Sequence, residues 1–137
     1  MTIRATLLTL VLVAGCGRTL ASSLDGRSTL PPPDAFDCVM KGFEADGFKR
    51  TSYDKDELRT TARRVNPSIR VSNTQFQKAY DVLEVDIGTS AKGETELNVK
   101  ASTVGEYFNQ AGQVYETQKT SPQAQEAART IAARCGG

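Results

Sequence analysis

The chain of 137 residues carries 17 basic and 16 acidic residues, a formal net charge of +1, and it contains no histidine and no tryptophan. A charge balance so close to neutral provides no basic field to gather nucleic acid. The lack of histidine removes the usual general base near neutral pH, the commonest metal ligand and the histidine-dependent catalytic triads. We therefore predict a non-enzymatic protein without a metal, a cofactor or a nucleic-acid partner.

The first sixteen residues have the order of an export signal. Arg4 precedes an apolar run over 5–12 that is too short to span a bilayer, and small residues then lead to a cysteine. The sequence Val13-Ala14-Gly15-Cys16 resembles the lipobox of bacterial lipoproteins. In that family the leader is cut before the cysteine, whose sulfur is diacylated and whose amine usually takes a third acyl chain such as palmitate. The resemblance implies a signal peptide over 1–15 and lipidation at Cys16.

An anchor of this kind would attach the protein to a membrane without help from a folded domain, because each buried CH₂ contributes about 0.8 kcal/mol. Gly17 follows the cysteine in place of an aspartate. By resemblance to the sorting rule of enteric bacteria, this implies the outer membrane, facing the periplasm. Two alternatives are a secretory signal cleaved later, for instance after Ala21, and an uncleaved anchor. The second is disfavoured because about ten apolar residues reach only about 15 Å in a helix.

Two cysteines remain once Cys16 is used for lipidation. Cys38 and Cys135 form an even pair in an oxidising compartment, where a disulfide is the default. Such a bridge would close a loop of nearly the whole domain, for which the chain-entropy model gives about 4 to 5 kcal/mol. A redox-active or metal-binding pair is the alternative, but the chain lacks Cys-x-x-Cys spacing and histidine.

Residues 16–33 are predicted to form the lipidated N-terminus and a tether. They show no sustained apolar period, and the run Pro31-Pro32-Pro33 favours an extended, stiff end. We expect this tether to hold one small domain, residues 34–137, away from the membrane.

The first helix is expected to begin after an N-cap at Asp34 and to end near Asp46, because Gly47 occupies a position that suits a left-handed stop. Helical spacing gathers apolar side chains on one side and small ones, including Cys38, on the adjoining strip. The apolar side consists of Phe36, Met40 and Phe43, with Val39 beside them.

Alternating apolar and polar residues predict four strands in two hairpins. The first hairpin joins 48–53 to 58–65 through a solvated turn, since the acidic turn lacks the glycine and distal glutamate of a calcium loop. The second joins 80–87 to 95–104. Residues 105–120, with their glycines and glutamines, favour an irregular crossing over the edge of the core.

The last helix is predicted to begin at the N-cap Ser121 and the N1 residue Pro122. Its buried stripe comprises Ala124, Ala127, Ala128, Ile131 and Cys135. The expected fold is therefore α+β: a helix, a four-stranded antiparallel sheet as two hairpins and a C-terminal helix, with both helices on one face. This order resembles the helix-grip modules of some outer-membrane lipoproteins, including an accessory subunit of the barrel-assembly machinery.

The exposed face of this sheet is the candidate partner face, and a solvated face with cross-strand charge pairs is the alternative interpretation. Its predicted residues are Arg59, Arg63, Tyr80, Glu84, Asp86 and Lys100. The first hypothesis is a lipid-anchored, non-enzymatic envelope protein whose domain contacts another envelope component. The alternative is a periplasmic binder of a small apolar or glycan ligand between the first helix and the sheet. That ligand would lie near Phe36, Met40, Phe43, Tyr107 and Phe108.

Overall fold

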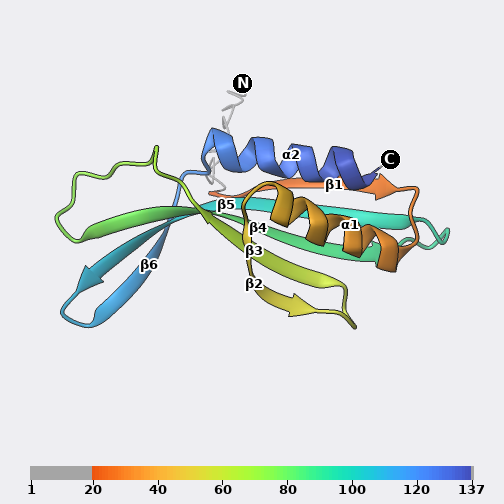
Figure 1. Ribbon diagram of the computed structural model, residues 1–137, viewed down its shortest axis with the longest axis horizontal. Coiled ribbons are helices and arrows are strands. Elements are labelled where there is room, and N and C mark those ends of the chain that lie inside the picture. The colour runs from red at the N-terminus through yellow and green to blue at the C-terminus, as the bar shows by residue number, and fades with distance from the viewer. Residues whose placement is uncertain (1–19, 137) are drawn as a thin grey trace, which may run out of the picture.

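The computed structural model describes residues 20–136, which form an α+β domain (Figure 1). The elements are β1 (Ser22–Ser28), α1 (Pro32–Ala45), β2 (Lys49–Asp54), β3 (Arg59–Val65), β4 (Phe76–Thr89), β5 (Thr95–Asn109), β6 (Gly112–Gln118) and α2 (Pro122–Gly136). The predicted lipobox, which ends at Cys16, lies outside the described residues. Within 20–136, no helix has the length and hydropathy required to cross a membrane.

The sheet is antiparallel and has six strands in the order β1-β5-β4-β3-β2, with β6 also paired to β5. The fold class and the two helices are confirmed, but the prediction of four strands is wrong. Strand β5 is long enough to hold two partners: β1 pairs with Thr95–Ala101, and β6 pairs with Thr103–Asn109. The β5–β6 hairpin consequently projects beyond the helices (Figure 1).

The first extra strand, β1, lies within the predicted tether and joins the sheet, so the boundary between tether and domain at residue 34 is wrong. Only Leu24 of this strand packs against the core, and all its pairing is with a strand some seventy residues away, which leaves little local signal. The helix that follows begins at Pro32 after the N-cap Pro31, rather than after Asp34, because proline suits the first helical turn. At most residues 17–21 separate Cys16 from the sheet.

The second extra strand, β6, lies in the region where an irregular crossing was predicted. Gly105 does not interrupt β5, because the ring of Tyr107 folds back over it: Cε2 lies 2.8 Å from where a Cβ would stand. Gly112 provides the positive φ of +105° where the chain enters β6. The glycines therefore serve a close contact and a turn within an ordered hairpin.

Both helices pack on one face of the sheet, and one apolar cluster fills the space between them and β3, β4 and β5. The first helix ends as predicted: the Phe48 N–H donates to the Phe43 carbonyl at 2.8 Å, and Gly47 has φ +76°. The helices approach closely at Gly42, where a Cβ would lie 2.5 Å from Ile131 Cδ1. Beside this contact, a disulfide joins Cys38 to Cys135, the pairing that the sequence predicts, with 5.7 Å between the two Cα atoms.

Candidate functional site

We call the sheet surface opposite the helices the open face. Residues directly opposite one another on antiparallel strands share a face, so the register decides which side chains meet there. Arg59 lies opposite Asp86, and Arg63 lies opposite Val82, two residues from Tyr80. Glu84 lies opposite Lys100. All six residues of the predicted partner face are therefore on the open face, in adjacent rows.

One part of the open face is charge-balanced. Arg59 donates from Nη2 and Nε to the same Asp86 oxygen, Oδ2, at 2.9 and 3.2 Å. This hydrogen bond, followed by the charge of Asp86, raises the pKa of Arg59. Both side chains are about half exposed, so the pair contributes little to folding or to binding. This row of the face matches the alternative interpretation of solvated cross-strand charge pairs.

The surroundings of Tyr80 differ from the prediction, because only 8% of this residue is exposed. The Arg63 guanidinium carbon lies 4.4 Å from the centre of its ring, and Lys78 Nζ lies 5.7 Å from it. Tyr80 therefore cannot be the contact residue that the sequence predicts. Its ring instead supports two cations, the half-buried Arg63 and the exposed Lys78.

A third cation, Lys49, lies opposite Arg63 on the edge strand β2. Val65, which is exposed, lies opposite Tyr80 on β3. We call Lys49, Arg63, Val65 and Lys78 the cationic patch. None of its three cations takes part in an ion pair within residues 20–136. The buried Glu106 lies opposite Lys78 on β5, so the patch has three cations beside one carboxylate and keeps an excess of positive charge.

A buried polar cluster that was not predicted from the sequence lies on the helix side of the sheet. Asp81 is 1% exposed, and its Oδ1 accepts hydrogen bonds from Ser121 Oγ at 2.6 Å and Thr103 Oγ1 at 3.1 Å. Asn66 Nδ2 donates to both carboxylate oxygens, at 3.2 and 3.0 Å. The alternation of residues along β4 could have revealed this cluster, because Asp81 falls on the same face as the buried residues Leu83, Val85 and Ile87.

This cluster positions the start of α2. Ser121 Oγ accepts from the Ala124 N–H at 2.9 Å, which is the N-cap that the sequence predicts. The Ser121 N–H donates to Thr103 Oγ1 at 2.8 Å, so the helix start is tied to β5 as well. Because the serine proton points to a carboxylate and its oxygen caps the helix, the arrangement suits an anchoring role and not a nucleophile.

The structure does not assemble the predicted ligand site. Phe36 and Phe43 are buried in the core, at 2% and 1% exposure, and contact Tyr53 and Phe48. Tyr107 lies on the β5–β6 hairpin and pairs with Phe76 at 5.5 Å. Phe108 is 62% exposed on the open face, away from both helices. The aromatic residues of α1 and of the hairpin therefore belong to different parts of the molecule.

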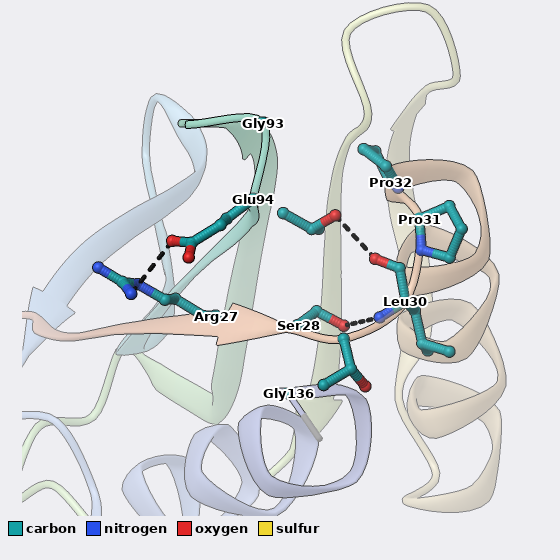
Figure 2. A pocket seen from close by; sticks show the side chains of 10 residues that line it. Arg27, Ser28, Leu30, Pro31, Pro32, Gly93, Glu94 and Gly136 are labelled. Atoms are coloured by element: carbon teal, nitrogen blue, oxygen red, sulfur yellow. Dashed lines mark hydrogen bonds and ion pairs between the residues drawn. The ribbon is translucent and has the colours of Figure 1, made fainter. Parts of the chain in front are cut away.

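A groove of about 670 Å³ lies where β1 leads into α1 (Figure 2). Figure 2 shows its polar groups bonded to one another: Arg27 pairs with Glu94 at 3.1 Å, and the Leu30 N–H donates to Ser28 Oγ at 3.2 Å. Thr95 donates to the Leu30 carbonyl at 2.7 Å. The groove thus offers a ligand few free polar groups. No cluster of metal-ligating side chains occurs within residues 20–136.

No family model matches the chain, and no curated protein matches it. Among solved structures, the crystal structure of Ara h 8.0201 is similar, with a TM-score of 0.43 and 11% sequence identity. The alignment covers 84% of this chain and 96% of that chain. A likeness at this level assigns neither a family nor a function.

Proposed function

We propose that the protein is a lipid-anchored, non-enzymatic component of the cell envelope that binds another envelope protein through the cationic patch. The lipobox of residues 13–16 supports the anchor. The observation that carries the binding role is the pair of cations over Tyr80, the half-buried Arg63 and the exposed Lys78, beside the exposed Val65. Unbalanced charge next to an apolar side chain favours a partner surface that is acidic and partly apolar.

The residues of the patch are held in place before binding. Arg63 and Lys78 come from adjacent strands and rest on the same buried ring, so less side-chain entropy is lost when they meet a partner. The rows that contain Arg59 and Asp86 would lie at the rim of such an interface. There, charge pairs influence association rate and specificity more than affinity.

Reversing both cations should weaken binding. We expect the double variant Arg63→Glu and Lys78→Glu to reduce recovery of the partner by at least about tenfold, a change of about 1.4 kcal/mol, because like charges would then face an acidic surface. The measurement is crosslinking in cells followed by purification of the anchored protein and quantification of the crosslinked partner.

A matched control is Arg129→Glu, which reverses an arginine on α2 whose side chain is 58% exposed. This variant should recover the partner at the level of the unmodified chain. The same yield from the double variant, with an unchanged melting temperature, would contradict a role for the cationic patch. Loss of the partner from Cys16→Ser alone would show that binding needs the anchor.

A further inference from the structure

The β5–β6 hairpin exposes apolar side chains on both of its faces. Phe108 and Tyr115 are 62% and 48% exposed on the open face. Val114 lies opposite Tyr107, hence on the helix side of the sheet, and is 39% exposed. The nine residues 107–115, which include the turn, contain no charged side chain. A protein partner bound to one face would leave the other face in water, whereas a membrane interface surrounds a hairpin tip on all sides.

The chain that leads to the lipobox reaches the domain at the base of this hairpin. Thr120, two residues after β6, donates to the Leu20 carbonyl, which fixes the entry of the chain beside the start of α2. Four peptide steps separate Cys16 from Leu20, and they span at most about 14 Å. If Cys16 carries acyl chains, the base of the hairpin lies within this distance of the lipid headgroups.

We propose that the tip of the β5–β6 hairpin, with Phe108, Val114 and Tyr115, docks in the interfacial layer of the lipid bilayer. This proposal rests on the acyl anchor of the proposed function. The hairpin begins at Thr103, the first residue of β5 that pairs with β6, and from there to its turn it is about 20 Å long at 3.4 Å per residue. The hairpin is therefore longer than the span of about 14 Å that the anchor allows between its base and the lipid headgroups. A hairpin perpendicular to the bilayer would pass beyond the headgroups, so we expect it to meet the membrane at an oblique angle.

Backbone chemistry limits the depth of docking. Among the strands described, β6 pairs with β5 alone, so its outer edge presents unpaired N–H and C=O groups. Such groups are too costly to carry into the hydrocarbon core, but water and headgroups satisfy them in the interfacial layer. The amphipathic ring of Tyr115 also favours that layer.

The lack of tryptophan makes the proposal directly measurable. The acylated mature protein, residues 16–137, would be reconstituted into phosphatidylcholine and phosphatidylglycerol vesicles with or without brominated phosphatidylcholine. The probes are Phe108→Trp and Val114→Trp, one on each face of the hairpin. We expect brominated lipid to reduce the fluorescence of each by at least about twofold, as for an indole in the interfacial layer.

The control is Tyr53→Trp, on the opposite edge strand β2, where the tyrosine is 47% exposed. Its emission should not change with brominated lipid. Hairpin probes that stay unquenched in protein that floats with the vesicles would overturn the docking and leave the anchor intact. Unquenched emission that shifts blue with protein density would place a second copy on the hairpin instead. Protein that does not float would overturn the anchor and the docking together.

Discussion

Replacing Asp81 with alanine is expected to lower the free energy of unfolding by about 3 to 5 kcal/mol, because it removes the acceptor around which a buried polar cluster is built. Asn66, Thr103 and Ser121 all donate to this carboxylate. After the substitution the hydroxyls of Thr103 and Ser121 would stay buried without an acceptor, and Asn66 Nδ2 would keep only its bond to Gln123 Oε1 at 3.3 Å. Arg64, with Nη2 3.9 Å from Asp81 Oδ2, would lose its nearest negative charge. Denaturant titration of the full chain would measure the loss.

The control is Asp86→Ala on the same strand, where the side chain is 43% exposed and pairs with Arg59. It should cost less than about 1 kcal/mol, because exposed pairs contribute little. Equal losses from the two substitutions would contradict the anchoring role of Asp81. A second readout is helix content: if the cluster fixes the start of α2, Asp81→Ala should lower the far-ultraviolet helical signal before global unfolding.

Removing the disulfide is expected to cost about 4 kcal/mol. Cys38 and Cys135 are 97 residues apart, so the bond closes a long loop whose entropy is lost from the unfolded chain. The bond also fixes α1 against α2 beside the close contact at Gly42. The test compares the unfolding midpoint of the double variant Cys38→Ala and Cys135→Ala with that of the unmodified protein.

The third cysteine provides the control for this experiment. Cys16→Ser should keep the unfolding midpoint of the parent, because Cys16 lies outside the described domain and the bridge stays in place. Reducing agent should lower the midpoint of the parent and of Cys16→Ser equally, and should leave the double variant unchanged. A parent midpoint that is insensitive to reducing agent would contradict the predicted contribution of the bridge.

Local patterns predicted the parts of the fold that local physics determines. Alternation in β4 and β5, the glycine stop of α1 and the serine cap of α2 each depend on a few neighbouring residues. The two missed strands depend on distant pairing. β1 has a single core-facing apolar residue, Leu24, and forms because β5 offers seven further residues along its edge.

The candidate site shows the same division. The alternation of side chains between the two faces of each strand correctly predicted that the six partner-face residues share one surface. The alternation did not reveal that Tyr80 is covered, because the covering cations, Arg63 and Lys78, come from two strands and their ring contacts depend on three-dimensional packing. The β5–β6 hairpin was not predicted for a related reason, because its glycines suggested irregular structure. The three-dimensional structure shows that the Tyr107 ring packs over Gly105, a contact that the sequence pattern does not reveal.

The anchor at Cys16 is the premise of both proposals, and the intact mass of the protein extracted from the membranes of its native host tests it most directly. We predict the mass of residues 16–137 with a diacylglyceryl group and a third acyl chain, less two hydrogen atoms for the disulfide. An unmodified chain that begins at Ser22, after cleavage behind Ala21, would contradict the account. It would leave β1 complete and remove the link to the membrane.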